Sequence, residues 1–190
     1  MQKFSTKFLY ECAISAFLPG IAVCPACGSK GQCKLHAYYG RNIIDFTGGK
    51  RHQEKVTVPR MMCGSCGHTH AVLPDVLVPY SSYSLLFILR VLADVFLLNH
   101  TQEKVCEDYE ISMKLLRKWI RLWREHKLLW LGLLKDAEIS DRDFLDELRT
   151  RDECSGFLHA FYEKSRFSFL QGHREPDYTR HRKARFRRGQ

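Results

Sequence analysis

The chain has 190 residues, 45% of them hydrophobic, which is enough for a packed core and argues against a disordered protein. Its formal net charge of +9 favours an anionic partner without identifying one. The longest apolar run, residues 85–98, contains Arg90 and Asp94 and is shorter than the roughly 20 residues of a membrane helix, so we expect no membrane association.

The first 21 residues form a separate N-terminal segment. It reads as a short helix or strand that ends at the turn signal Pro19-Gly20. Lys3 and Lys7 precede an apolar run, as in a signal peptide, but Glu11 interrupts that run and no good cleavage site precedes Cys24. We therefore expect a cytoplasmic protein.

Four of the eight cysteines form two Cys-x-x-Cys-Gly motifs, Cys24/Cys27 and Cys63/Cys66. This spacing is too short for easy disulfide formation, but it lets two thiolates face one tetrahedral ion. A redox dithiol is the alternative, although such an enzyme usually carries a single motif at a helix N-terminus. The motifs predict a β zinc ribbon over residues 22–74, in which the four cysteines hold one structural zinc ion with no open coordination position.

Other candidate ligands lie near these motifs. Cys33, His68 and His70 are close enough in sequence to replace a ligand, although a strand or loop residue needs no such role. The remaining cysteines have apolar neighbours and are predicted to be small buried side chains; they are Cys12, Cys106 and Cys154.

Extended segments surround the cysteine motifs. Strand-like stretches are expected at 35–39, 41–46, 55–62 and 70–73, with a mobile loop over 45–52. Pro74 and Pro79 then bracket an extended linker, residues 75–80.

After the linker the apolar period changes from 2 to 3.6, which predicts an all-α domain over residues 81–130. Ser82 is the expected N-cap of a buried helix over 83–98, and Thr101 caps a short helix over 102–109. A turn over 110–112 follows, with Ile111 directed to the core. A short helix, a tight turn and a longer helix are typical of a helix-turn-helix.

The helix predicted over 112–127 is half apolar and half basic. One side holds leucines, Ile120 and two tryptophans, so Trp119 and Trp123 are assigned to the core; the segment carries six Lys or Arg residues against Glu125. A solvated amphipathic helix is the alternative. In a helix-turn-helix, the N-terminal part of the second helix enters the major groove of DNA. The candidate residues for base edges or phosphates are Ser112, Met113, Lys114, Arg117 and Lys118, with Arg121 and Arg124 on the DNA backbone.

Residues 131–172 are predicted to form C-terminal helices. Ser140 opens one of them in a capping-box pattern, with Phe144, Leu145 and Leu148 on one face, and a second helix covers 155–164. The final segment, 173–190, is a basic tail expected to be disordered.

An acidic segment, residues 136–153, contains eight acids against three arginines. Carboxylates such as Asp141 and Asp143 hold Mg²⁺ in nucleases, but here they lie on a helical surface and no apolar strands present them. We therefore expect a solvated helix rather than a metal-dependent nuclease.

The segment CPACG, Tyr39 and Arg41, VPRMMCGSCGHTHAVLP, a linker and a helix-turn-helix ending in KWIRLW follow one another in this chain. In that order they resemble the N-terminal portion of bacterial insertion-sequence transposases, and most of all a group of short stand-alone zinc-ribbon proteins associated with mobile elements. The resemblance covers about residues 22–127 and implies recognition of double-stranded DNA at element ends, with a recombinase or transposase as partner. Only 63 residues follow Lys127, and we expect them to form helices and a tail rather than a catalytic domain.

We therefore expect an α+β protein: a small β zinc ribbon followed by an all-α domain that contains a helix-turn-helix. Its expected function is non-catalytic binding of duplex DNA. The alternative is a protein-interaction adaptor or transcriptional regulator that uses the ribbon as a docking surface.

Overall fold

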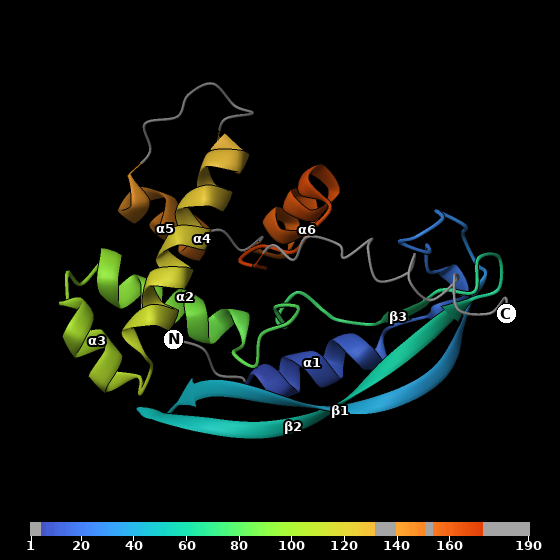
Figure 1. Cartoon of the computed structure of the whole chain (residues 1–190), viewed down its shortest axis with the longest axis horizontal. Coiled ribbons are helices and arrows are strands. Elements are labelled where there is room, and N and C mark those ends of the chain that lie inside the picture. The colour runs from blue at the N-terminus through green and yellow to red at the C-terminus, as the bar shows by residue number, and fades with distance from the viewer. Residues whose placement is uncertain (1–4, 132–139, 151–153, 173–190) are drawn as a thin grey trace, which may run out of the picture.

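The computed structural model describes residues 5–131, 140–150 and 154–172, and it has the expected α+β architecture (Figure 1). A three-stranded antiparallel sheet in the order β1-β2-β3 carries the cysteine motifs, and a mostly helical region follows it. The elements are α1 (Thr6–Ser15), a 3-10 turn η1 (Pro19–Ile21), β1 (Cys33–Thr47), β2 (Lys50–Cys63), β3 (Thr69–Ala71), α2 (Leu85–Phe96), α3 (Gln102–Asp108), α4 (Met113–Leu131), α5 (Asp141–Thr150) and α6 (Cys154–Ser165).

Strands β1 and β2 form one long hairpin that runs along a whole side of the molecule (Figure 1). They pair from Thr47 and Lys50 at the turn to Cys33 and Cys63 at the other end. Two glycines with positive φ, 60° and 77°, make the turn, which suits the right-handed twist of the strands. The mobile loop expected over 45–52 is therefore wrong, because the Gly-Gly pair needs only two residues to reverse the chain.

Helix α1 lies against the hairpin (Figure 1). The Tyr10 ring is 2% exposed, packs in the cluster of Ile43 and Val58, and donates its hydroxyl proton to the Thr57 carbonyl at 2.9 Å. The prediction that Cys12 is buried is wrong: it is exposed on α1, because Tyr10 and Ile14 occupy the face that packs on the sheet.

The helical region has an aromatic core. Trp123 of α4 is fully buried, with ring-centroid distances of 6.1 Å to Phe96, 5.2 Å to Phe144 and 5.7 Å to Phe169. Trp119 is 3% exposed, so both tryptophans belong to the core, as their place on the helical wheel predicted. Leu145, Leu148, Phe157, Leu158 and Phe161 of α5 and α6 are buried as well.

Helix α2 begins two residues later than predicted. Its N-cap is Ser84, whose hydroxyl accepts the Phe87 N–H at 3.0 Å, and not Ser82. The reason is a long-range pairing: the Ile44 N–H donates to the Ser82 carbonyl at 2.7 Å, and Ile44 forms a β-bridge with Tyr83. Residues 82–83 therefore extend the edge of β1 before the helix starts.

The turn end of the hairpin is built into the helical core. Ile44 is one of its buried residues, and the Phe46 ring lies 4.7 Å from that of Tyr109. The segment predicted as a linker contributes Leu77 and Val78, each 2% exposed. The segment thus packs against the sheet through Leu77 and against the helices through Val78.

The remaining helix boundaries follow local signals. Thr101 caps α3 by accepting the Lys104 N–H at 3.3 Å, and Ser112 caps α4 by accepting the Leu115 N–H at 3.2 Å, as predicted. Ile111 between them is 7% exposed and plugs the core. The basic tail at 173–190 and residues 132–139 and 151–153 lie outside the described residues. Within the described part, none of the helices has the length and apolar character that crossing a bilayer requires.

Candidate metal centre and basic helix face

The two cysteine motifs meet at the end of the hairpin opposite its turn. The Sγ atoms of Cys24, Cys27, Cys63 and Cys66 all lie within 4.8 Å of one another. The Cys24–Cys66 and Cys27–Cys63 sulfur distances are both 3.7 Å. Four ligands at about 2.3 Å from a tetrahedral zinc ion are about 3.8 Å apart, so this thiol set has the right size for a metal ion and offers it no open position.

The two motifs have the same backbone hydrogen bonds. The Cys24 N–H donates to the Ser29 carbonyl at 2.9 Å, and the Gly28 N–H donates to the Cys24 carbonyl at 2.8 Å. Cys63 and Gly67 repeat both bonds at 3.0 and 2.9 Å. Each glycine has a φ above 70°, which favours glycine, so the repeated Cys-x-x-Cys-Gly sequence specifies two equivalent knuckles.

Hydrogen bonds favour the thiolate, the form that binds metal, at two of the four cysteines. The hydroxyl and then the backbone N–H of Ser29 lower the pKa of Cys27 to about 6. The backbone of Cys66 likewise lowers the pKa of Cys63. At Cys66 the backbone of His68 lowers the pKa, but burial and the hydrogen bonds with the other three sulfurs outweigh it and raise the pKa to about 12.

The three additional ligand candidates occupy different places. Cys33 is buried opposite Cys63 in the β1–β2 register, and burial raises the pKa of its thiol. His70 places Nε2 3.4 Å from the Cys24 sulfur, whereas His68 is exposed and stacks on the His70 ring at 6.4 Å. None of these residues belongs to the four-sulfur group, and His70 is positioned to orient a ligand from outside it.

The sequence named His70 as one of three possible replacement ligands but did not distinguish it from Cys33 and His68, although a weak signal existed. His70 pairs with Met61 in the β2–β3 register, and Met61 is buried beside the cysteines. Paired residues share a face of the sheet, so the side chain of His70 is brought to the cluster.

Helix α4 presents the residues predicted to contact DNA. Ser112, Lys114, Arg117, Lys118, Arg121 and Arg124 are exposed, and Met113 is half-buried. Among the described residues, no carboxylate forms an ion pair with Lys114, Arg117 or Lys118. In the described part of the chain, the N-terminal half of this face therefore keeps its positive charge uncompensated.

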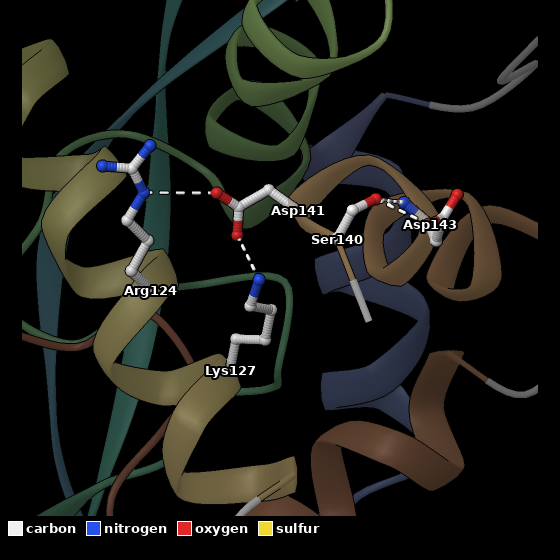
Figure 2. A network of polar contacts seen from close by, with 5 residues as sticks. All are labelled: Arg124, Lys127, Ser140, Asp141 and Asp143. Carbon is white, nitrogen blue, oxygen red and sulfur yellow. Dashed lines mark hydrogen bonds and ion pairs between the residues drawn. The ribbon is translucent and has the colours of Figure 1, made fainter. Parts of the chain in front are cut away.

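The C-terminal half of the face is partly neutralised (Figure 2). Arg124 Nε lies 3.2 Å and Lys127 Nζ 2.5 Å from the carboxylate of Asp141, and Arg121 pairs with Glu125 at 3.7 Å. Burial raises the pKa of Asp141, but the hydrogen bonds and charges of Lys127 and Arg124 outweigh this effect and lower it.

Figure 2 also shows how Asp141 is held in place. It is the first residue of α5, directly after the cap Ser140, whose hydroxyl accepts the Asp143 N–H at 3.1 Å and donates to the Asp143 carboxylate at 2.6 Å. The capping pattern predicted for this helix is thus confirmed, and it leaves Asp141 directed at α4.

A family model described as a domain of unknown function (DUF6431) matches residues 24–119. The match begins at the first cysteine of the metal centre and ends at Trp119, so it covers the sheet, α2, α3 and the first turns of α4. No curated protein and no solved structure matches the chain.

Proposed function

The chain belongs to this family, a domain of unknown function (DUF6431), and we propose that it is a zinc-containing protein that binds duplex DNA without catalysing a reaction. Cys24, Cys27, Cys63 and Cys66 would hold the zinc ion. With four sulfur ligands the ion supplies folding energy and does not activate water.

The uncompensated cations on the first half of α4 are the observation that carries the DNA proposal. In a helix-turn-helix this half of the second helix faces the major groove, and Lys114, Arg117 and Lys118 lie on it. The apolar face of the same helix is buried, so the basic face is the one that α4 offers to a partner. Helix α3 carries three exposed acids against Lys104, which restricts the attractive surface to α4.

The order of the ribbon and the helix pair resembles transposase N-terminal regions. On that resemblance we propose that the DNA is the end of a mobile element and that a recombinase or transposase is the partner. The carboxylate of Asp141, which a nuclease would use for Mg²⁺, is instead bonded to Arg124 and Lys127, and this supports a non-catalytic role.

The test is a salt-dependent mobility shift on duplex DNA. The triple variant Lys114→Ala/Arg117→Ala/Arg121→Ala should bind far more weakly, with a log–log salt slope smaller by about 2.7, since each lost phosphate contact removes about 0.9. A matched control, Lys34→Ala/Lys50→Ala/Lys55→Ala, removes the same charge from exposed positions of the hairpin. If both variants lose the same DNA affinity, binding depends on the net charge of the protein and not on α4. An unchanged affinity in the α4 variant would disprove the proposal. Selection from a random DNA pool would then define the target site.

The adaptor alternative has one observation in its favour. Leu18, Ile21 and Val23 next to the first knuckle are 62%, 75% and 51% exposed, and apolar groups of this kind commonly mark contact with another protein. Replacing Ile21 with Ser should leave DNA binding unchanged under the main proposal, whereas a ribbon that docks a protein would lose that partner.

A further inference from the structure

A hollow of about 820 Å³ separates the metal-binding end of the sheet from the C-terminal helices. Strands β1–β3 form one wall, α6 and the segment after it form another, and the loop 79–82 closes the third side. Its volume is in the range of small-ligand sites, which lie between about 300 and 1,000 Å³.

Aromatic side chains from three separate elements line this hollow. Tyr39 of β1 and Tyr162 of α6 are each 37% exposed, and Tyr80 of the loop is 73% exposed. Rings left this accessible contribute little to the core. They offer flat surfaces on which other planar groups can stack.

The hollow is also cationic. Of the described residues that line it, Arg41, Arg60 and Arg166 are arginines and Asp75 is a carboxylate. The Arg166 side chain is 74% exposed and pairs with the exposed Glu163 at 3.3 Å, and Arg60 is exposed with a bond to the Thr69 hydroxyl at 2.9 Å. An anionic ligand would therefore be favoured over a cationic one.

The loop that carries Tyr80 is held in a costly conformation. Tyr80 has a φ of 60°, in the left-handed region that a bulky side chain rarely adopts. Arg41 fixes the loop by donating to the Val78 carbonyl at 2.6 Å and the Ser81 carbonyl at 2.5 Å. A half-buried arginine thus keeps an exposed tyrosine in place, and backbone strain of this kind is concentrated at functional sites.

A second hollow of about 500 Å³ shares the loop 79–82 and is lined on its other side by Lys118 and Arg121 of α4. Tyr80 borders both hollows. A chain of nucleotides could therefore pass from the basic face of α4 to the metal-binding end of the sheet along surfaces that are mainly cationic.

We propose that the hollow beside Tyr80 binds a short run of unpaired nucleotides, with bases stacked on the tyrosines and phosphates near Arg60 and Arg166. Concave surfaces that combine aromatic rings with cations bind single strands, because unpaired bases expose their faces and paired bases do not. This activity goes beyond duplex recognition by α4, because the protein would have a second site that binds single-stranded nucleic acid.

The test uses the full-length, zinc-loaded protein and fluorescence anisotropy of labelled oligothymidylate and oligouridylate of about eight nucleotides. The key variant is Tyr80→Gly. Glycine favours the left-handed backbone, so the melting temperature should stay the same or rise. Affinity for the oligonucleotide should nevertheless fall by about five- to 150-fold, the range of one lost base stack.

Two further variants separate stacking from folding. Tyr80→Phe keeps the ring and should keep binding. Tyr38→Ala removes a neighbouring tyrosine of β1 that is 61% exposed but does not line the hollow, and it should bind as the wild type does. Tighter binding of oligouridylate than of oligothymidylate would assign the site to RNA, and the reverse to DNA, and either result supports the proposal.

The proposal fails if neither oligonucleotide binds, if Tyr80→Gly binds as well as the wild type, or if Tyr38→Ala loses as much. It also fails if an acidic peptide binds the hollow as tightly and displaces the oligonucleotide, since the site would then serve a protein. The triple variant of Lys114, Arg117 and Arg121 separates the two proposals. It should lose duplex binding and retain most single-strand binding, so that each proposal can fail alone.

Discussion

The two ends of the β1–β2 hairpin are stabilised in different ways. At one end the chain is held by four sulfur atoms, and the buried apolar side chains around them are few, chiefly Met61 and Val72. At the other end Ile44 and Phe46 enter an aromatic core that joins all the helices from α2 to α6. The same pair of strands therefore has a site for a metal ion at one end and apolar packing at the other.

Because of this difference, the two ends of the hairpin are expected to fold independently of each other. Under the proposed zinc binding, a ribbon with so small a core needs its ion to fold, so metal binding and folding would be one event there. The helical end has enough buried area to fold by itself and presents its basic face on a stable helix. Loss of metal should therefore unfold the ribbon end and leave α4 in place, and the largest predicted effect tests this.

Replacing Cys63 with Ser should abolish stoichiometric zinc binding, because a site with three sulfur ligands binds the ion far more weakly. Structural zinc contributes an apparent free energy of about 10–16 kcal/mol in zinc-finger peptides, so the ribbon end should lose protection from amide exchange. Protection of α2 and α4 should persist. Metal analysis and hydrogen exchange provide the measurements.

The control for this variant is Cys12→Ser, since Cys12 is an exposed cysteine outside the sulfur group. It should keep about one zinc ion per chain. If Cys63→Ser melts the helices as well, the two ends are not independently stabilised and the comparison is wrong.

The second prediction tests the helical end of the hairpin. Trp123→Ala should lower the free energy of unfolding by about 3–5 kcal/mol, because it opens a cavity among Phe96, Phe144 and Phe169. Denaturant melts followed by circular dichroism measure it. Leu128→Ala on the same helix, where the side chain is 62% exposed, should change stability by less than about 0.5 kcal/mol. Loss of zinc from Trp123→Ala under native conditions would show that the ribbon depends on the helical core.

Much of this division was predictable from the sequence, because it rests on local signals. The Cys-x-x-Cys-Gly spacing predicted the sulfur group, and the hydroxyls of Thr101, Ser112 and Ser140 predicted three helix starts. Each of these signals acts over a few residues, which is the range in which a sequence can be interpreted directly.

Apart from the loop over 45–52 and Cys12, which concern a local Gly-Gly turn and a helix face, what the sequence missed lies where distant segments meet. The pairing of Ile44 with residues 82–83 moves the start of α2 from the expected cap to Ser84. His70 reaches Cys24 only through the β2–β3 register, and the bond from Arg124 to Asp141 joins two helices. The hollow beside Tyr80 needs three separate elements. None of these contacts has a local signature.

Asp45 joins β1 to the start of α1 and to the cap of α2 near the turn end of the hairpin, and its removal is the third prediction. Its buried carboxylate accepts the Thr6 N–H of α1 at 3.0 Å, the Phe46 N–H at 2.9 Å and the Ser84 hydroxyl of the α2 cap at 3.2 Å. Asp45→Ala should cost about 2–3 kcal/mol, because it leaves buried donors without an acceptor. Asp45→Asn keeps one acceptor oxygen and should cost less. A denaturant melt of Asp45→Ala that matches the wild type would show that solvent replaces these bonds.

The smallest predicted effect concerns Asp141, which joins α5 to the basic face of α4 (Figure 2). Asp141→Asn should cost about 1 kcal/mol at neutral pH, because water screens the exposed pair with Arg124, whereas the shorter pair with Lys127, whose side chain is 13% exposed, is screened less. The pKa of Asp141 is lowered in the folded state, so its contribution is complete above the unfolded value of about 3.9 and is lost as the pH falls through the folded value. The unfolding free energies of the variant and the wild type should therefore converge once the pH has fallen below the lowered pKa of Asp141 in the folded state.

The same substitution should strengthen duplex binding while it weakens the fold. Without the Asp141 charge, Arg124 becomes available to a phosphate, and one added contact raises the log–log salt slope by about 0.9. Asp143→Asn changes the net charge equally but leaves Arg124 paired, since the Asp143 carboxylate is bonded to Ser140. If only Asp141→Asn binds duplex DNA more tightly, then Asp141 of α5 lowers the affinity of the basic face of α4 for DNA by pairing with Arg124. Equal gains in both variants would mean that only net charge matters, and the pair seen in Figure 2 would then be a surface ion pair that restrains neither DNA binding nor α4.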